Sequence, residues 1–260
     1  MRIITCNTNG IRAAAKKGFF DWLKEQDADV VCIQETKAQE AQLIALDSMF
    51  HPEGYHCFYS DAVKKGYSGT AVFAKKKPLA ITKSLGFDVC DTEGRWLQAD
   101  FETVSVISLY LPSGSSGDER QQRKYDFMDK CLPLFKTMAA DKTRDYIICA
   151  DWNICHTELD LKNWKANKKN SGFLPEERAW MDDLLTQYGF SDSYRELYPD
   201  KPQYTWWSNR GQAYANDVGW RLDYMLATGN LIGKAKAACV FKDIKFSDHA
   251  PLIIDYQGEL

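Results

Sequence analysis

The sequence predicts a mixed α/β protein in which helices cover β-sheets, and three observations support this fold class. Residues 2–35 read as strand, helix and strand, which is typical of a helix packed over a sheet. Residues 55–109 form short strand-like segments separated by turns, which favours antiparallel hairpins. The chain opens and closes on strands and contains no linker, repeat or low-complexity segment, so we expect one domain over residues 1–260.

The composition is that of an ordinary globular protein with a small negative charge. Hydrophobic residues make up 45% of the chain and charged residues 27%, and the net charge is −3. A protein that coats nucleic acid non-specifically is normally basic, so any nucleic-acid binding here must rest on a local basic face or a metal ion. There is no signal peptide and no long apolar run, so neither secretion nor membrane insertion is indicated.

The eight cysteines form no C-x-x-C pair. Four of them stand in apolar strand-like runs and are expected to be buried free thiols of a reducing compartment: Cys6, Cys32, Cys149 and Cys239. Cys155 and His156 could supply half of a zinc site, but no second pair has a suitable spacing, so we set zinc aside.

The first elements run strand, helix, strand. Residues 2–6 are a strand that ends in a turn, and apolar residues recur at helical spacing over 15–26. Residues 29–35 are a second strand, and it ends in a carboxylate. If the two strands are parallel neighbours, Asn7 and Glu35 lie at the same edge of the sheet.

A short helix over residues 38–49 is followed by hairpins. The expected strands cover residues 55–60, 70–74, 79–85, 95–101 and 104–109. The loop over 63–69 carries Lys64, Lys65 and Tyr67 and contains two glycines, Gly66 and Gly69, which suits a phosphate backbone. A solvated hairpin tip explains the same residues equally well.

The second half of the chain alternates helices, loops and strands. A helix is expected over residues 119–138, with a kink or break near Leu132 because Pro133 follows. The remaining elements are strands at 146–151, 220–226, 235–241 and 252–255 and a helix from Pro175 to Gly189. The stretch 156–172 mixes lysines with asparagines, which suits phosphate contact, although a solvated loop is the commoner fate of such a stretch.

The strand at 146–151 is the most informative element, because it runs into Asp151 and Asn153. If the extended conformation continues, both side chains lie on the same side. Unpaired polar groups are costly to bury, so strand ends that carry them usually face a cleft. For Asp-x-Asn alone, an Asx-type turn is the commoner reading.

Similar polar residues stand at other strand ends or starts. They are Asn7, Glu35, Tyr110, Asp151, Asn153, Asp223, Asp248 and His249. If one sheet edge gathers them, the oxygen ligands favour Mg²⁺ or Mn²⁺ over zinc. Such an ion beside a histidine and a tyrosine suits phosphate-ester cleavage. Each residue alone has a structural explanation, so the residues by themselves support only a metal-dependent hydrolase.

Six blocks, in family order and spread over the whole chain, resemble the exodeoxyribonuclease III family of apurinic/apyrimidinic endonucleases. They lie at residues 6–12, 32–37, 150–154, 170–178, 220–224 and 247–251. The resemblance implies a four-layer αββα sandwich like that of deoxyribonuclease I, in the endonuclease/exonuclease/phosphatase superfamily. It also implies Mg²⁺-dependent cleavage 5′ to abasic sites, with Mn²⁺ as an alternative, beside 3′-phosphodiesterase, 3′-phosphatase and 3′→5′ exonuclease activity.

The resemblance also implies partners and a location. The substrate is double-stranded DNA that contains abasic sites or blocked 3′ ends. We expect a monomer with no membrane association, in the cytoplasm of a bacterium.

Site roles are carried over residue by residue. Glu35 looks like the main metal ligand, Asp151 like the group that binds or deprotonates the attacking water, and His249 like a phosphate contact oriented by Asp223. Tyr110 would donate to the phosphate or the leaving group. The implied catalytic set is Tyr110, Asp151, Asn153, Asp223 and His249, and the implied metal set is Asn7, Glu35, Asp151, Asn153, Asp248 and His249.

Similar enzymes line a pocket for the abasic sugar with aromatic and aliphatic side chains. Trp206, Trp220 and Leu222 match those places, and the further DNA-contact residues are Asn170, Tyr67 and Lys168. Asn9 stands where some relatives carry an acid, so it is left out of the ligand set.

Two alternatives remain from the sequence. The first is a phosphatase or phospholipase of the same fold that acts on a phosphoester other than DNA, such as an inositol-polyphosphate phosphatase or a sphingomyelinase, because these enzymes use a similar metal site. A catalytically silent DNA-binding relative is the second alternative. The complete set of family blocks argues against the first, and the presence of every catalytic position argues against the second.

Overall fold

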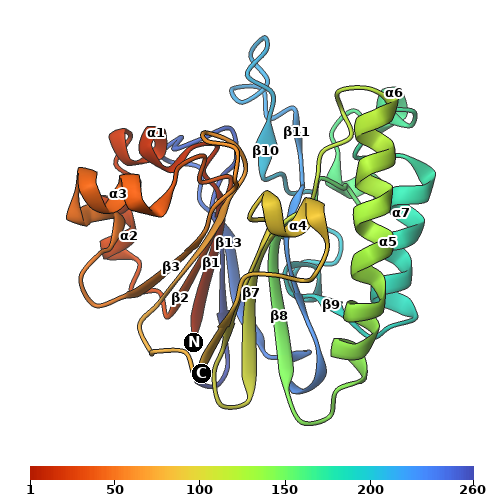
Figure 1. Cartoon of the computed structure of the whole chain (residues 1–260). Coiled ribbons are helices and arrows are strands. Elements are labelled where there is room, and N and C mark those ends of the chain that lie inside the picture. The colour runs from red at the N-terminus through yellow and green to blue at the C-terminus, as the bar shows by residue number, and fades with distance from the viewer.

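A computed structural model describes all 260 residues, and two six-stranded sheets packed face to face form its centre (Figure 1). The order of the first sheet is β13 (Ala235–Val240), β14 (Leu252–Tyr256), β1 (Arg2–Asn7), β2 (Val30–Gln34), β4 (Thr70–Ala74) and β3 (His56–Ser60). β1 and β2 are parallel, as expected, and their register pairs Asn7 with Gln34. Asn7 and Glu35 therefore lie at the same edge of this sheet.

The second sheet brings further polar residues to the same level. Its order is β5 (Ala80–Thr82), β6 (Trp96–Asp100), β7 (Val104–Tyr110), β8 (Asp145–Asp151), β12 (Asp223–Ala227) and β9 (Ser191–Asp192). β7 runs parallel to β8 and pairs Tyr110 with Asp151, and β12 runs antiparallel and pairs Asp223 with Asp151. Three strands thus deliver Tyr110, Asp151 and Asp223 side by side.

Helices cover the outer faces of both sheets (Figure 1). Beside the first sheet lie α1 (Ile11–Lys16), α2 (Phe19–Glu25) and α3 (Glu40–Leu46), and beside the second lie α5 (Asp118–Ala140) and α7 (Pro175–Thr186). Three large apolar clusters fill the spaces between the four layers. The central strands β2, β4 and β12 are buried along their whole length, so they read as continuous, mostly apolar runs rather than as alternating patterns. The four-layer αββα sandwich is confirmed.

A polar link crosses the apolar layer between the sheets, close to the edge that carries the polar residues. Gln34 on β2 donates from Nε2 to Ser108 Oγ on β7 (3.0 Å) and to the carbonyl of Cys149 on β8 (3.3 Å). Ser108 in turn donates to the carbonyl of Ile33 (2.9 Å). A buried network whose members are all paired favours one relative placement of the two sheets.

Smaller elements complete the chain. The strands β10 (Trp206–Trp207) and β11 (Gly219–Trp220) form a separate ribbon. The short helices are α4 (Asp88–Thr92), α6 (Trp164–Asn167) and α8 (Ser193–Leu197), with 3₁₀ turns at Ser48–Phe50, Glu158–Asp160 and Gly229–Leu231. No helix combines the length and the apolar character that crossing a bilayer requires.

Two helix predictions were wrong in detail. The helix expected over 15–26 is two helices, because Gly18 adopts a left-handed conformation (φ 87°) between them. The break expected near Leu132 does not occur, and α5 continues through Pro133. Phe127 and Phe135 are buried in the cluster beneath the helix on either side of the proline, and this packing outweighs the lost backbone hydrogen bond.

Two strand predictions were also wrong in detail. The strand expected over 220–226 is interrupted, because the buried Arg221 turns inward to ion-pair with Asp160 and Asp192 between β11 and β12. The strand expected over 79–85 ends at Thr82. The expectation for Cys239 was wrong as well, since the thiol is exposed on the edge strand β13, whereas Cys6, Cys32 and Cys149 are buried.

Candidate active site

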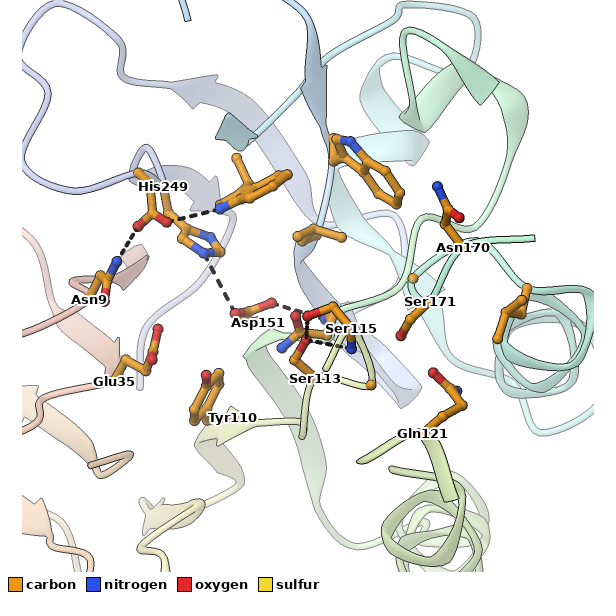
Figure 2. A pocket seen from close by; sticks show the side chains of 18 of the residues that line it. Asn9, Glu35, Tyr110, Ser113, Ser115, Gln121, Asp151, Asn170, Ser171 and His249 are labelled. Atoms are coloured by element: carbon orange, nitrogen blue, oxygen red, sulfur yellow. Dashed lines mark hydrogen bonds and ion pairs between the residues drawn. The ribbon is translucent and has the colours of Figure 1, made fainter. Parts of the chain in front are cut away.

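A cleft of about 810 Å³ opens at the edge where the polar residues of the two sheets meet. Figure 2 shows Glu35, Tyr110, Asp151 and His249 gathered on one side of it and Ser171 and Gln121 on the other. Of the residues proposed from the sequence, those that line the cleft are Glu35, Tyr110, Asp151, Asn153, Asn170, Trp206, Trp220, Leu222, Asp248 and His249. Asn7 and Asp223 are buried beneath it and contact lining residues.

A buried histidine stands between two buried carboxylates at the floor of the cleft. His249 Nδ1 lies 2.8 Å from Asp223 Oδ2, and His249 Nε2 lies 3.7 Å from Asp151 Oδ2. Exposed fractions are 2%, 1% and 6% for Asp151, Asp223 and His249. The ligand atoms of the three residues lie within 4.8 Å of one another, which is compact enough for a metal ion. The Asp223–His249 hydrogen bond uses two of these atoms, so the geometry favours an internal charge network.

Burial and charge set opposite protonation preferences within this network. Burial raises the pKa of Asp151 to about 7, and the charge of Asp223 adds to the rise. Burial alone lowers the pKa of His249, but the charges of Asp223 and Asp151 outweigh it and raise that pKa to about 10. Near neutral pH, His249 is therefore a cation, and Asp151 is the group poised to exchange a proton.

Asp151 is held by hydrogen bonds from both sides. Asn7 Nδ2 donates to its Oδ2 (2.8 Å), and the backbone N–H of Asn153 donates to its Oδ1 (2.9 Å). The second bond closes an Asx-type turn, and Asn153 adopts a left-handed conformation (φ 51°). The extended strand therefore stops at Asp151. Asn153 still lines the cleft, and its Nδ2 donates to the carbonyl of Leu111 (2.9 Å).

An oxygen-rich group lies beside this network on the cleft floor. Glu35 ion-pairs with Lys37 (3.1 Å), and Lys37 also donates to Asn9 Oδ1. Asn9 Nδ2 donates to Asp248 Oδ1 (2.9 Å), and Trp206 Nε1 donates to Asp248 Oδ2 (3.1 Å). Burial raises the pKa of Asp248, but the nearby His249 and these donors outweigh burial and hold it below the usual value. The carboxylates and amide oxygens here fit a hard divalent cation.

The ring of Tyr110 packs against the buried guanidinium group of Arg95. The guanidinium of Arg95 lies 4.6 Å from the centre of the Tyr110 ring, and Nη1 donates to the Tyr110 carbonyl (2.9 Å). Burial, the charge of Glu35 and a hydrogen bond with Glu35 raise the pKa of Tyr110 well above its usual value, although Arg95 opposes the rise. Tyr110 therefore keeps its proton at neutral pH, and its hydroxyl can donate a hydrogen bond.

Two aromatic rings and a leucine form one wall of the cleft. β10 and β11 pair Trp206 with Trp220, and the rings meet edge to face with centroids 6.2 Å apart. Leu222 is mostly buried below them. Gly172 closes against the Trp220 ring, because a Cβ at this glycine would lie 3.2 Å from Trp220 Cζ3.

Two of the residues proposed for DNA contact lie outside the cleft. The Tyr67 hydroxyl accepts a hydrogen bond from Arg95 Nη2 (3.2 Å), so Tyr67 packs beside the cation that supports Tyr110. The exposed Lys168 directly follows α6, and its Nζ lies 4.6 Å from the centre of the Trp164 ring at the start of that helix. Nothing in the sequence around Tyr67 or Lys168 indicates either contact.

Sequence reasoning missed several residues of the cleft. Asn9 and Lys37 lie at its oxygen-rich end, and Asn9 was set aside only because some relatives carry an acid there. The turn after β1 and the lysine directly after the Gln34–Thr36 segment were signals that could have found them. The far half is lined mainly by Ser113, Gly114, Ser115, Gly117, Asp118, Gln121, Lys169, Ser171 and Leu174. The sequence indicated phosphate contact for the stretch 156–172 and a family block at 170–178, but it carried no signal for Asp118 and Gln121 and only a flexible loop for residues 113–117.

The charge network makes a prediction for the metal-free protein. We expect the Asp223→Asn variant to lower the pKa of His249, because it removes the strongest of the charges that stabilise the imidazolium. The measurement is an NMR titration of the four histidines, with a His249→Gln sample to assign the signal and the exposed Asp217→Asn as control. A neutral His249 at pH 7, with a pKa that Asp223→Asn leaves unmoved, would contradict the network.

Comparison with known proteins gives a consistent result. Residues 4–249 match the Endonuclease/Exonuclease/phosphatase family. The chain is 40% identical over 254 residues to an exodeoxyribonuclease of Bacillus subtilis, with 97% of this chain and 98% of that protein covered. It is 38% identical to the DNA repair nuclease APEX1 of Danio rerio, with 98% and 81% covered. Its structure resembles an AP endonuclease from Archaeoglobus fulgidus with a TM-score of 0.89 at 26% identity, covering 99% of this chain and all of that one.

Proposed function

Because the chain belongs to the Endonuclease/Exonuclease/phosphatase family, we propose that it is a DNA repair hydrolase that incises DNA on the 5′ side of abasic sites. The names of the related DNA repair nuclease and of the structurally similar AP endonuclease support this substrate. The observation that carries the proposal is the buried Asp151–His249–Asp223 network at the floor of a cleft walled by two tryptophans.

The reaction requires a base for water and stabilisation of the charge that develops on the phosphate. Asp151 takes the proton from water, because its pKa of about 7 suits a base at neutral pH. His249 is a cation that holds the phosphate, and Asp223 fixes its ring and charge. Tyr110 donates a hydrogen bond to the phosphate or to the leaving oxygen. Asn153 helps to place the water beside Asp151.

A divalent cation fits the oxygen-rich end of the cleft, and Mg²⁺, with Mn²⁺ as the alternative, suits its donors. Glu35, Asn7 and Asp248 would hold it, while Asp151, Asn153 and His249, the other members of the set implied by resemblance, face the substrate. When bound, the ion polarises the phosphoryl oxygen and offsets its charge. In the protein without the ion, the ammonium group of Lys37 offsets the negative charge of Glu35.

The tryptophan wall accounts for the choice of an abasic sugar, because a narrow aromatic pocket admits a sugar that has lost its base. We expect Trp220→Ala to reduce the preference for abasic over intact duplex while leaving Mg²⁺ affinity within about twofold. Competition binding and calorimetry measure the two quantities, and Tyr214→Ala, an aromatic outside the cleft, is the control. An unchanged preference for abasic over intact duplex in both Trp220→Ala and Trp206→Ala would show that the two tryptophans do not select the abasic sugar.

The same chemistry covers further substrates. We propose 3′-phosphodiesterase, 3′-phosphatase and 3′→5′ exonuclease activity on double-stranded DNA with blocked 3′ ends, by a monomer in the bacterial cytoplasm that folds as one domain over residues 1–260. The exodeoxyribonuclease from Bacillus subtilis, matched over 98% of its length, supports this proposal.

The direct test is a duplex with one abasic site, incubated with Mg²⁺ and, separately, with chelator. We expect a single Mg²⁺-dependent nick beside the abasic site and no phosphate release from an inositol polyphosphate under the same conditions. Release from the inositol polyphosphate without nicking would favour a phosphatase of the same fold. Binding without any nicking would favour a catalytically silent relative.

A further inference from the structure

A lysine and a glutamate form a fully buried ion pair behind the cleft. Lys124 lies on α5 and Glu177 on α7, and both side chains have 0% exposure. Lys124 Nζ donates to Glu177 Oε1 and also to the backbone carbonyl of Asn153 (2.8 Å). Taking both charges out of water is costly, and a buried ion pair is often no more stabilising than apolar side chains of the same size. Stability alone therefore does not account for this pair.

The carboxylate of Glu177 holds the opposite wall of the cleft. Its Oε2 accepts hydrogen bonds from the backbone N–H groups of Gly172 (2.7 Å) and Leu174 (3.0 Å). Its Oε1 accepts a further hydrogen bond from Gln121 Nε2 (3.0 Å). The pair thus binds the turn after β8 through Lys124 and the turn before α7 through Glu177.

Both turns have little freedom and both line the cleft. Asn153 has a left-handed backbone conformation, and its side-chain amide donates to the carbonyl of Leu111. The hydrogen bond from Lys124 to the backbone carbonyl of Asn153 restrains the residue further. At Gly172, a Cβ would lie 3.2 Å from the Asn153 carbonyl oxygen and 3.2 Å from the Trp220 ring. The backbone of Gly172 is therefore in close contact with Asn153 on one side and with the tryptophan wall on the other.

We propose that Lys124 and Glu177 are a positioning pair that locks Asn153 and Gly172 into one rigid unit, and so sets turnover and the choice of an abasic sugar together. This inference rests on the proposed function. Neither residue lines the cleft, so the pair acts only through the two turns that it holds. Displacement of a reacting group by about 1 Å can cost roughly 10²-fold in rate.

The test separates positioning from stability with two variants. Lys124→Met removes the donor to Asn153 and leaves the Glu177 charge buried, so we expect both a lower unfolding temperature and a kcat lowered roughly 10- to 100-fold. Lys124→Met combined with Glu177→Gln removes the uncompensated charge, so the unfolding temperature should recover. Its kcat should stay low, because the carbonyl of Asn153 still lacks its donor. Lys130→Met, on the exposed face of the same helix, is the control.

A second readout does not depend on turnover. In chelator, the double variant should bind abasic duplex with a smaller preference over intact duplex than the wild type, because the Gly172 side of the pocket has lost its charged anchor. Recovery of kcat and of this preference along with the unfolding temperature would overturn the inference and leave a structural pair. A wild-type protein that does not nick abasic DNA would instead refute the proposed function, while the binding comparison would still test the pair.

Discussion

The Asp151→Asn variant is expected to turn over abasic-site DNA about 10²–10⁴-fold more slowly than the wild type, with little loss of DNA affinity. Asparagine keeps the size of the side chain and one of the two oxygens that accept hydrogen bonds from Asn7 and Asn153, but it cannot take a proton from water. Single-turnover nicking rates and binding measured in chelator separate the two effects.

Asp145→Asn is a matched control, because Asp145 begins the same strand β8 at the opposite end from the cleft. If Asp151→Asn retains near-normal single-turnover rates, Asp151 is not the base, and His249 becomes the stronger candidate.

The Glu35→Ala variant is expected to abolish nicking at ordinary Mg²⁺ concentrations while the fold is retained. Glu35 is the carboxylate at the oxygen-rich end of the cleft that has Lys37 and Tyr110 as side-chain partners, so its removal takes away a cleft-lining ligand rather than an apolar core contact. Calorimetric titration with Mg²⁺ should show weakened binding, and nicking should return in part when Mg²⁺ is raised.

Glu40→Ala provides the comparison, since Glu40 is a partly exposed glutamate at the start of α3. Full activity of a folded Glu35→Ala protein, with unchanged Mg²⁺ affinity, would contradict the assignment of the metal end of the cleft.

Much of the site could be predicted because its residues stand at the ends of strands, and strand pairing places those ends together. Tyr110, Asp151 and Asp223 follow or begin apolar strands, and the register of β7, β8 and β12 brings them side by side. Asn7 and Glu35 meet for the same reason at the ends of two parallel strands. A run of buried apolar residues that stops at a polar one is visible in a sequence, and so is the edge to which it leads.

The remainder depended on contacts between distant segments. Nothing near Tyr67 in the sequence indicates that Arg95 would bind it and support Tyr110 from behind. The Lys124–Glu177 pair joins two helices whose residues are 53 positions apart. Arg221 interrupts a strand-like sequence pattern because it ion-pairs with the buried Asp160 and Asp192. Such pairs are decided by packing of the whole chain, which local propensity does not describe.

The measurement that tests the central claim most directly is the identification of both ends of the incised strand in water enriched in ¹⁸O. Hydrolysis 5′ to the abasic site breaks the bond between phosphorus and the upstream 3′ oxygen, and the water oxygen joins the phosphate. The account predicts an unmodified 3′-hydroxyl on the upstream fragment and one ¹⁸O in the 5′-phosphate on the abasic sugar, formed only with Mg²⁺. An unsaturated aldehyde at the 3′ end and no ¹⁸O in the phosphate would show elimination instead and would contradict it.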